Sequence, residues 1–584
     1  MLFSKLAETF QELEETSSQT AMVEILSALF QEATSQNIDK LCFLALGQIA
    51  PGYEDVKIGM AERMVRSSIA LAAGKSDEEI DRRLRAVGDL GTIAAKVIRI
   101  GTPRLTQDLA LEKKLEVEEV LTGLRQIAAV EGKGSQEFKK KKLAAMLARG
   151  NDTERKYLAR LAAGQMRLGV GEMTLLDSLA TAFLGSKKER SPLEKAYNLS
   201  SDIGHVSKTL MESGLEGVKK IGIAVNRPIR PMLSQRVSHL SQIRNKIPSR
   251  LVSAEEKYDG ERIQAHKDNG RVRLFSRRLS DVTSHFPDIV EHVRESVAAR
   301  KAIIDGEAVA YDFEKDVYRP FQKLMRRRRK YDVELFAREI PVKYKPFDLL
   351  YLDGEEYVDR SYPRRREQLE KILLVSKYVE PAGRKVTEDL DEIEEFFQDC
   401  VQKGLEGIVC KSCGEDSVYR AGAREWLWIK WKPDYSAELS DTFDLAVVGA
   451  FSGRGKRGGT YGALLCAAYD DKRDVFQTVT KLGAGFTDED LAGLPEKLAS
   501  AKKDRKPARV DTTDQMKPDF WFEPEYVLEV RASEITKSPV HSCGWDAEEK
   551  KGLALRFPRF MMWRPEKSVE QATTVNEIRQ MHKG

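Results

Sequence analysis

The sequence KYDGER, from Lys257 to Arg262, lies where helix-type sequence gives way to short β-type runs. Asp-Gly is a frequent turn dipeptide, so the simplest interpretation is a surface β-turn that joins two strands. A second interpretation is a nucleophilic lysine. A lysine amine becomes nucleophilic when it is desolvated or lies beside other cations, the glycine permits a tight turn, and the arginine can meet a phosphate or a ribose. The rest of the chain separates the two interpretations.

Residues 1–225 are predicted to form a helical domain. Segments such as AMVEILSALFQEA and VEEVLTGLRQIAAVE place apolar residues three and four positions apart, with charged residues between them. In GSQEFKKKKLAAMLARG we expect Ser135 to cap a helix that carries four lysines in its first turns, Lys139, Lys140, Lys141 and Lys142. Because cations oppose the helix dipole there, the lysines form either a solvated face or a contact for phosphates.

The remaining chain is predicted to hold a linker and two further domains. Residues 226–250 contain three prolines and five arginines with little periodicity, so we expect a basic linker. Between 251 and 436, β-type runs such as RIQAHKD, AIIDGEAVAYD and WLWIKWK alternate with helical stretches, which predicts an α/β domain. From 437 to 584, strand-type runs with Gly-rich turns (FDLAVVGAFSG, GALLCAAYD, YVLEVRASEI) predict a small β-barrel.

The composition narrows the class of protein. Charged residues make up 32 % and hydrophobic residues 41 %, which is typical of a globular protein with an ionised surface. The net charge of +4 neither supports nor excludes nucleic acid. Six scattered cysteines are too few for a disulfide framework, and the CxxC at Cys410 and Cys413 lacks the second ligand pair of a zinc site. With no bilayer-spanning run and no signal peptide, we expect a soluble cytoplasmic protein with buried thiols.

Two acids and two lysines favour the nucleophile. Glu307 lies in the strand-type run IIDGEAV, and Glu406 precedes a β-type run in EGIVCK. Lys430 and Lys432 are two residues apart in WLWIKWK, so on a strand both amines project from the same face. Two such cations repel each other unless an anion lies between them, and a nucleotide α-phosphate is a suitable anion. The two carboxylates are hard oxygen ligands that suit Mg²⁺.

The ordered series KYDGER, FSRR, IDGEAV, PFDLLYLDG, EGIVCK and WLWIKWKPDY resembles the motif set of covalent nucleotidyltransferases. This superfamily comprises ATP-dependent DNA ligases, some RNA ligases and mRNA capping enzymes. Flanking segments, among them YRPFQKLMRRRRKYD, KLGAGFTDEDL and KGLALRFPRFMMWRPEK, resemble the replicative DNA ligases of archaea and eukaryotes, and QMRLGVGEMTLLDSLATAF extends the resemblance into the helical part. It therefore covers essentially the whole chain. It implies an all-α DNA-binding domain, an α/β adenylation domain and a C-terminal OB-fold barrel.

The resemblance also implies residue roles. Lys257 would carry AMP, Glu255 would accept from the adenine amino group, and Phe347 would stack on the base. A further set of arginines, lysines and acids would contact the ribose, the phosphates and a metal ion. It comprises Arg262 and Arg277 at the ribose and phosphates, Glu307 at the ribose and metal, Glu406 at the metal, and Arg424, Lys430 and Lys432 around the α-phosphate. A terminal basic motif would orient the leaving pyrophosphate, with Glu566 where relatives often have Asp; its members are Arg556, Arg559, Arg564 and Lys567.

The implied activity is the sealing of nicks in duplex DNA during replication, repair and recombination, with ATP, a lysyl-AMP intermediate and Mg²⁺ or Mn²⁺. We expect a monomer that grips DNA with all three domains. A basic run offers phosphate contacts or is a solvated loop; it comprises Arg326, Arg327, Arg328, Arg329 and Lys330. Related archaeal ligases carry a sliding-clamp box with two aromatics. Here Gln107 begins a matching segment, but Ala110 and Leu111 replace the aromatics, so we expect weak clamp binding there.

Three other interpretations remain open from the residues. An RNA-directed nucleotidyltransferase shares the lysine motifs, although the long helical part and the RFPRF segment speak against it. A catalytically inactive DNA-binding scaffold would not need the intact lysines and acids. An NAD-dependent ligase would carry a four-cysteine zinc module, which the cysteine spacing does not supply.

Overall fold

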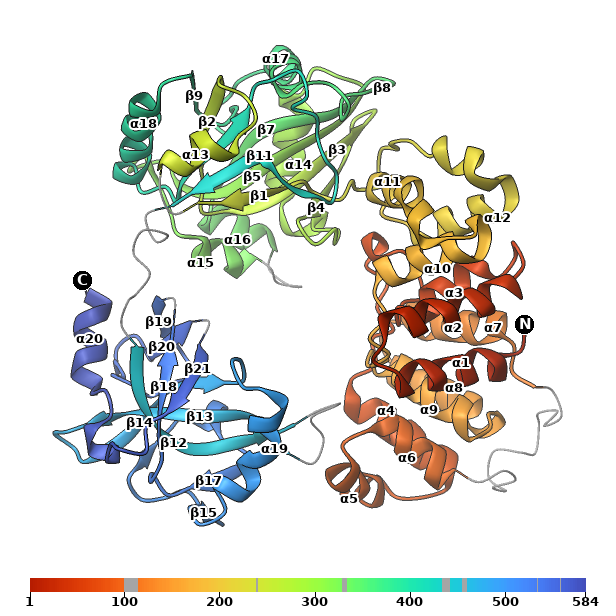
Figure 1. The fold of residues 1–584 in the computed structure, drawn as a ribbon, viewed down its shortest axis with the longest axis vertical. Helices are drawn as coiled ribbons and strands as arrows, with labels where there is room; N and C mark the ends of the chain where they lie inside the picture. The colour runs from red at the N-terminus through yellow and green to blue at the C-terminus, as the bar shows by residue number, and fades with distance from the viewer. Residues whose placement is uncertain are drawn as a thin grey trace. The chain divides into compact units, whose positions relative to one another are not determined.

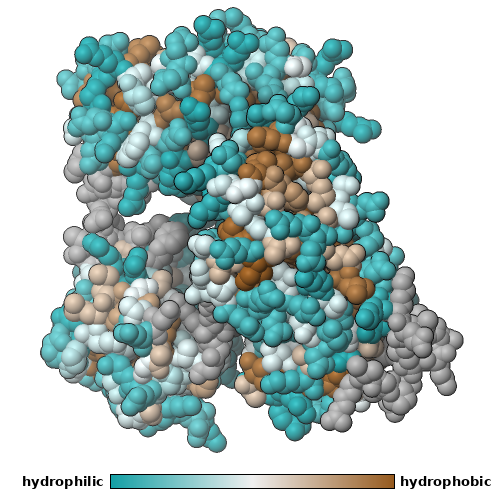
Figure 2. All heavy atoms as spheres, turned by 45° about the vertical axis from the view of Figure 1, so that its right-hand side comes forward, coloured by the Kyte–Doolittle hydropathy of each residue, from teal (hydrophilic) through white to brown (hydrophobic). Residues whose placement is uncertain are grey.

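The computed structural model describes residues 1–98, 114–237, 240–327, 333–432, 442–453, 460–532, 534–556 and 558–583. The chain divides into two compact units, which we treat separately (Figure 1). The first unit comprises residues 1–77 and 94–436, and the second comprises residues 78–93 and 437–584. Hydrophilic residues cover most of the face seen in Figure 2, as the charged composition predicts.

The N-terminal part of the first unit is helical, as predicted. Its helices bury one apolar side; in α1, for example, Phe3, Leu6 and Phe10 have no exposed surface. The helices are α1 Phe3–Glu15, α2 Gln19–Gln31, α3 Ile38–Ala45, α4 Glu62–Ala73, α7 Val117–Ala129, α8 Ser135–Arg149, α9 Asp152–Ala162, α10 Glu172–Leu184, α11 Ser191–Ser200 and α12 Ile203–Lys219. Helix α5 Asp77–Val87 belongs to the second unit from Glu78 onward, and the chain returns to the first unit at Ala94, within helix α6 Leu90–Val97.

The expected cap of α8 is wrong. Gly134, not Ser135, occupies the N-cap position, with φ of 87°, and no side chain caps the helix. Because a glycine adopts this left-handed conformation without strain, Ser135 becomes the first helical residue. Helix α9 instead has a full capping box, in which Asn151 and Glu154 each accept from the backbone N–H of the other.

The rest of the first unit is built on two sheets (Figure 1). The first sheet has the order β1-β11-β10-β2-β9, with β1 Leu233–Arg236, β2 Val252–Lys257, β9 Arg384–Thr387, β10 Gly407–Ser412 and β11 Arg424–Trp431. The second sheet has the order β4-β3-β5-β7-β8, with β3 Glu261–Asp268, β4 Arg271–Ser276, β5 Lys301–Asp312, β7 Val342–Leu352 and β8 Glu355–Glu356; β6 Val317–Tyr318 pairs with β5. Strand β1 pairs parallel with β11, and the other pairings are antiparallel. The α/β prediction is confirmed.

Apolar clusters lie between and behind these sheets. One cluster joins Ile303 and Leu350 of the second sheet to Leu427 and Trp428 of the first. Helices cover the outer sides: α14 Pro287–Ser296 contacts β3, β4 and β7, and α18 Leu390–Gln402 contacts β2, β9 and β10. Shorter helices complete this part, namely α13 Leu240–Lys246, α15 Phe321–Leu324, α16 Val333–Glu339 and α17 Tyr362–Ile372. The segment expected as a plain linker thus contributes β1 and α13.

The second unit is a strand-rich domain, as expected for the C-terminal part. Its main sheet runs β15-β17-β12-β13-β14-β16, with β18 on β12 and β21 on β18, while β19 and β20 form a separate pair. The strands are β12 Thr442–Ser452, β13 Tyr461–Asp470, β14 Val475–Leu482, β15 Lys502–Lys503, β16 Val510–Asp511, β17 Phe520–Phe522, β18 Val527–Arg531, β19 Glu534–Ser538, β20 Gly552–Arg556 and β21 Arg559–Trp563, with helices α19 Asp488–Lys497 and α20 Val575–Lys583. The run YVLEVRASEI is divided between β18 and β19, which have different partners.

All six cysteines are unpaired thiols, and each is buried except the partly exposed Cys413. Within the described ranges, no helix has the length and apolar character needed to cross a membrane.

A buried ion pair ties α17 to β7. Arg365 donates from Nε and Nη2 to both carboxylate oxygens of Asp348, at 2.7 and 3.0 Å, and neither side chain has exposed surface. Nη1 of Arg365 donates to the carbonyl oxygens of Arg360 and Ser417. Asp348 follows Phe347, so this pair anchors the part of β7 that bears the expected base-stacking ring.

We predict that Arg365→Ala destabilises this part of the structure by about 3–5 kcal/mol, because it leaves the Asp348 carboxylate buried without its partner. Hydrogen exchange of the β7 and α17 amides, followed by mass spectrometry, should accelerate accordingly. Arg364→Ala, on the exposed side of the same helix, should change the free energy by less than about 0.5 kcal/mol. Equal protection in both variants would contradict this assignment.

Candidate active site

Lys257 is the last residue of β2, and its ammonium group forms an ion pair with Glu406. The other oxygen of Glu406 lies 2.7 Å from Nζ of Lys432. The backbone N–H of Glu406 also donates to the carbonyl oxygen of Lys257, at 2.9 Å. Burial works against the Glu406 carboxylate, but the two lysines outweigh it and lower its pKa. One acid thus holds two of the predicted site lysines together.

The turn after Lys257 is tightly packed rather than a loose surface turn. Tyr258 is only 4 % exposed, and Asp259 accepts a hydrogen bond from the backbone N–H of Phe321, at 3.0 Å. At Gly260 a Cβ atom would lie 2.4 Å from the carbonyl oxygen of Ala308, so a side chain is excluded. The glycine of KYDGER is therefore required by the close approach of β5.

Glu307 and Lys430 have strongly displaced pKa values. Burial raises the pKa of Glu307 to about 8, against the opposing effect of Lys257 and Arg262. Burial also lowers the pKa of Lys430 to about 8, with a further contribution from the like charges of Lys257 and Lys432. Such displacements are frequent where a site is built to receive a charged partner.

Positive charge exceeds negative charge here. Arg277 and Arg424 contribute to the low pKa of Lys430, and the pKa of Arg277 is itself lowered by burial, Arg262 and Arg424. These cations lie on β2, β3 and β11 and on the residues that directly follow β4 and β11. The arrangement can bind an anion and can place a lysine amine beside it.

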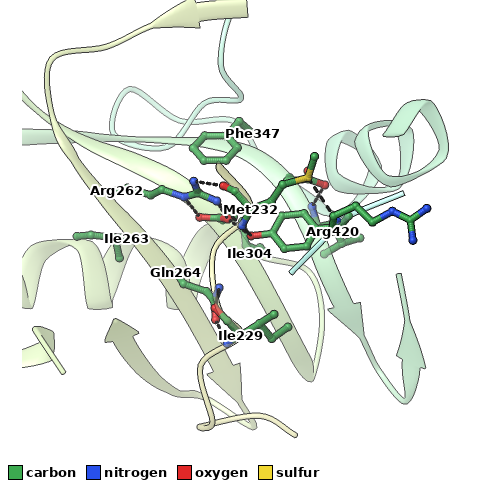
Figure 3. A network of polar contacts seen from close by, with 12 residues as sticks. Ile229, Met232, Arg262, Ile263, Gln264, Ile304, Phe347 and Arg420 are labelled. Atoms are coloured by element: carbon green, nitrogen blue, oxygen red, sulfur yellow. Dashed lines mark hydrogen bonds and ion pairs between the residues drawn. The ribbon is translucent and has the colours of Figure 1, made fainter. Parts of the chain in front are cut away.

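Arg262 is bound within the protein (Figure 3). Its Nε and Nη2 donate to the carboxylate of Asp305, at 3.0 and 2.6 Å, and Nη1 donates to the carbonyl oxygen of Met232, at 2.7 Å. Nη2 also donates to the Tyr419 hydroxyl, at 3.1 Å. Burial opposes the charge of Arg262, but Asp305 more than offsets this effect and raises its pKa. Sequence reasoning missed Asp305, although it precedes the glycine of the quoted run IIDGEAV.

Phe347 and Glu255 lie on either side of the Lys411 ammonium group. The Phe347 ring meets Trp428 edge to face, with centroids 6.1 Å apart, and the guanidinium carbon of Arg262 lies 5.4 Å from its centroid. Glu255 is 2 % exposed; one of its oxygens lies 2.7 Å from Nζ of Lys411, and the other accepts from the Tyr362 hydroxyl.

Lys411 and Tyr362 were not among the predicted residues. Lys411 ends the run EGIVCK, so its strand was visible in the sequence, whereas Tyr362 begins a helix about a hundred residues from Glu255 and gave no local signal. Nζ of Lys411 also lies 4.7 Å from the Phe347 ring centroid.

Two carboxylates of the pocket suit a divalent cation. Glu307 and Glu406 are close enough for each charge to affect the other, and the burial that raises the pKa of Glu307 would be offset by a cation. In the described ranges no group of three or more His, Cys, Asp or Glu residues could hold a metal by itself. The donor set therefore fits a metal ion that also takes ligands from a phosphate or water.

The terminal basic motif lies in the second unit, where Arg564 and Lys567 form ion pairs with acids. Arg564 lies 3.1 Å from Asp444 and 2.8 Å from Glu529, and Lys567 lies 2.5 Å from Asp444. Arg556 and Arg559 are exposed, at the end of β20 and the start of β21.

The expected DNA contacts differ in accessibility. Arg327 is 1 % exposed and pairs with Asp288, so burial keeps its guanidinium from an external phosphate in this structure. Its neighbour Arg326 lies over the Phe336 ring, while Arg328, Arg329 and the clamp segment at Gln107 lie outside the described residues.

The four lysines on α8 also differ in their exposure to solvent. Lys139 is 9 % exposed, whereas Lys140 and Lys141 pair with Glu137 one turn earlier. Lys142 is exposed. Glu137 therefore offsets part of the lysine charge that would otherwise favour an external anion.

Comparison with known proteins links the pocket to one family. Residues 2–180, 231–432 and 457–567 match the family models "DNA ligase N terminus", "ATP dependent DNA ligase domain" and "ATP dependent DNA ligase C terminal region". The chain is 44 % identical to DNA ligase 2 of Thermofilum pendens and 42 % identical to a DNA ligase of Sulfolobus acidocaldarius, with 100 % of this chain and 97 and 98 % of those proteins covered. The solved structure Pmar-Lig_Pre shares the fold, with a TM-score of 0.56 at 16 % identity over 96 % of this chain and 99 % of that one.

We predict that Lys432→Met raises the pKa of Lys430 from about 8, because it removes a neighbouring like charge. The pKa can be followed by ¹³C NMR of labelled lysine side chains during a pH titration of the protein without nucleotide. Lys385→Met, which replaces an exposed lysine on β9, is the control and should leave the titration unchanged. An unchanged Lys430 titration in Lys432→Met would show that the two ammonium groups do not interact.

Proposed function

Because the chain belongs to the family of ATP-dependent DNA ligases, we propose that it seals nicks in duplex DNA through an adenylylated Lys257. The observation that carries this proposal is the position of Lys257 beside Glu406 and Lys432. Lys430 is also close, because the charge of Lys257 contributes to its lowered pKa. A lysine amine that lies beside other cations can act as a nucleophile toward a bound phosphate. Its neighbours can neutralise the charge that develops.

Three displacements at phosphorus follow. In the first, the Lys257 amine attacks the α-phosphorus of ATP, a P–N bond forms, the bond to the β-phosphate oxygen breaks, and pyrophosphate leaves while the amine loses a proton. In the second, an oxygen of the 5′-phosphate at a nick displaces the lysine and takes the AMP. In the third, the 3′-hydroxyl attacks that 5′-phosphate and releases AMP. Such steps depend mainly on positioning and on neutralisation of charge.

Different residues of the site contact the base, the ribose and the phosphates of ATP. Phe347 stacks on adenine and Glu255 accepts from its amino group, held for this by Lys411 and Tyr362. The ribose and phosphates are met by a further set, which comprises Arg262, Arg277, Glu307, Arg424, Lys430 and Lys432. In the second unit, Arg556, Arg559, Arg564 and Lys567 orient the pyrophosphate.

The chemistry also calls for a divalent cation. Glu307 and Glu406 would hold Mg²⁺, or Mn²⁺ in its place. When bound, the metal ion neutralises charge on the phosphates of ATP.

The proposal also covers the DNA that receives the AMP and a sliding clamp as a candidate partner. A monomer grips nicked duplex DNA with a helical domain (1–225), an adenylation domain (251–436) and a C-terminal domain (437–584), through lysines and arginines that contact phosphates without reading sequence. Lys140, Lys141, Lys142 and Arg326 are the accessible candidates. A sliding clamp would bind only weakly near Gln107, because the segment lacks aromatic anchors.

We predict that Lys257→Ala abolishes protein-bound label after incubation with α-labelled ATP and Mg²⁺, because the attacking amine is gone. Lys257→Arg should do the same, since a guanidinium remains protonated and is not a nucleophile. The adduct is detected by denaturing gel electrophoresis, and Lys385→Met should be labelled like the wild type. Label on Lys257→Ala would remove the nucleophile assignment.

We further predict that the labelled wild-type protein transfers its AMP to a singly nicked DNA duplex and joins the strands. A nicked duplex made of RNA should leave the protein labelled. Product strands are separated on a denaturing gel, with an intact DNA duplex as the control for label loss without a nick. Equal discharge by the RNA duplex would favour an RNA ligase instead.

A further inference from the structure

A buried lysine lies behind the Lys257 turn and has no part in the chemistry above. Lys345, on β7, is 4 % exposed, and its Nζ lies 2.5 Å from Oε1 of Glu380. The same nitrogen lies 5.2 Å from the ring centroid of Tyr258 and 5.9 Å from that of Tyr318. Burial lowers the pKa of Lys345, and Glu380 opposes this change. Burying an ammonium group costs free energy, so a lysine at this position suggests that its charge has a role.

The partner of Lys345 belongs to a segment that joins the two sheets. On one side, residues 380–382 bind β7: the N–H of Glu380 donates to Tyr344 at 3.4 Å, and that of Ala382 donates to Pro346 at 2.8 Å. On the other side, the N–H of Glu256, on β2, donates to the carbonyl oxygen of Gly383 at 2.9 Å. A Cβ on Gly383 would lie 2.6 Å from the Glu256 carboxylate. The segment is therefore a close-fitting bridge between β7 and β2.

Tyr258, the residue after Lys257, is fixed by the same bridge. Its hydroxyl donates to Glu256 and accepts from the N–H of Gly383, at 3.3 Å. Its ring faces Lys345, which comes from the other sheet. Tyr258 is thus bound at its hydroxyl by β2 and the bridge, and at its ring by a cation of β7.

We propose that Lys345 is a positioning residue for Lys257, which sets the separation between the sheet that carries the nucleophile and the sheet that carries Glu307. The inference rests on the proposed function of Lys257. Attack on phosphorus requires the reacting atoms to approach within about 3–3.5 Å in line, so a small change in this separation slows the reaction strongly. We expect the adenine end of the site to change less, because Glu255 is held there by Lys411 and Tyr362.

Lys343 provides a matched control. It lies two residues earlier on β7, its Nζ is 3.4 Å from the same Glu380 oxygen, and its side chain is 13 % exposed. Its ring neighbours, however, are Tyr311 and Phe313, at 3.9 and 5.8 Å, which belong to β5 and the residue after it. Lys343 therefore shares the partner of Lys345 without linking the two sheets.

The test compares Lys345→Met with Lys343→Met in the full chain. Single-turnover formation of the lysyl-AMP adduct is measured over a range of ATP concentrations with Mg²⁺, which gives a maximal rate and a half-saturating concentration. We expect Lys345→Met to lower the maximal rate at least about tenfold while the half-saturating ATP concentration changes less than about twofold, because misplacement affects the reacting atoms alone. Lys343→Met should leave both quantities near the wild-type values.

Three results would overturn the inference: a wild-type rate in Lys345→Met, an equal loss in Lys343→Met, or a raised half-saturating concentration at an unchanged maximal rate. Thermal unfolding shows whether Lys345→Met is folded. Should it not fold, Tyr258→Phe removes only the hydroxyl from the bridge and must show the same selective loss of rate. An adduct that forms in the wild type and is absent in Lys257→Ala keeps the proposed function intact whatever Lys345→Met does.

Discussion

The carboxylate of Glu406 lies between the ammonium groups of Lys257 and Lys432, and the rest of the site depends on this arrangement. Lys430 is influenced by the charges of the same two lysines and by those of Arg424 and Arg277, so positive charge accumulates beside this arrangement. Burial then makes the excess charge expensive, and Lys430 responds with a pKa near 8. An incoming polyphosphate supplies the missing negative charge, so nucleotide binding and the ionisation of the site are coupled.

The two-sheet architecture explains why these groups meet. Lys257 ends β2, and the register places it opposite Gly407, directly after Glu406, whereas Glu307 lies on β5 opposite Arg262. The nucleophile and one acid thus come from one sheet, and the second acid comes from the other. A site divided in this way needs a fixed separation between the sheets. The apolar cluster around Trp428 and the bridge at residues 380–383 both contribute to it.

Apolar periodicity was enough to predict the helical part and the strand-rich parts, and the order of the motifs indicated which residues would form the candidate site. Both signals depend on residues that are close together in the sequence. The predictions that needed correction depended on distant partners or on the backbone. Arg327 looked like an exposed phosphate contact until Asp288, 39 residues away, was seen to bury it. Ser135 looked like a cap, but the left-handed Gly134 displaced it by one residue. Lys345 gave no signal in the sequence, because its aromatic neighbours Tyr258 and Tyr318 lie far from it along the chain.

The ion pair between Arg262 and Asp305 limits how Arg262 can contact a nucleotide. Asp305 is 1 % exposed, so an Arg262 side chain that swung away to a phosphate would leave a buried carboxylate unpaired, at a cost of about 3–5 kcal/mol. Four of the five N–H groups of Arg262 already donate to described residues, which leaves one on Nη1. Arg262 can therefore offer a single hydrogen bond to a ribose or phosphate without moving. It is a fixed part of the site beside Phe347, so Arg277, Arg424 and the lysines are better placed to supply positive charge to a phosphate.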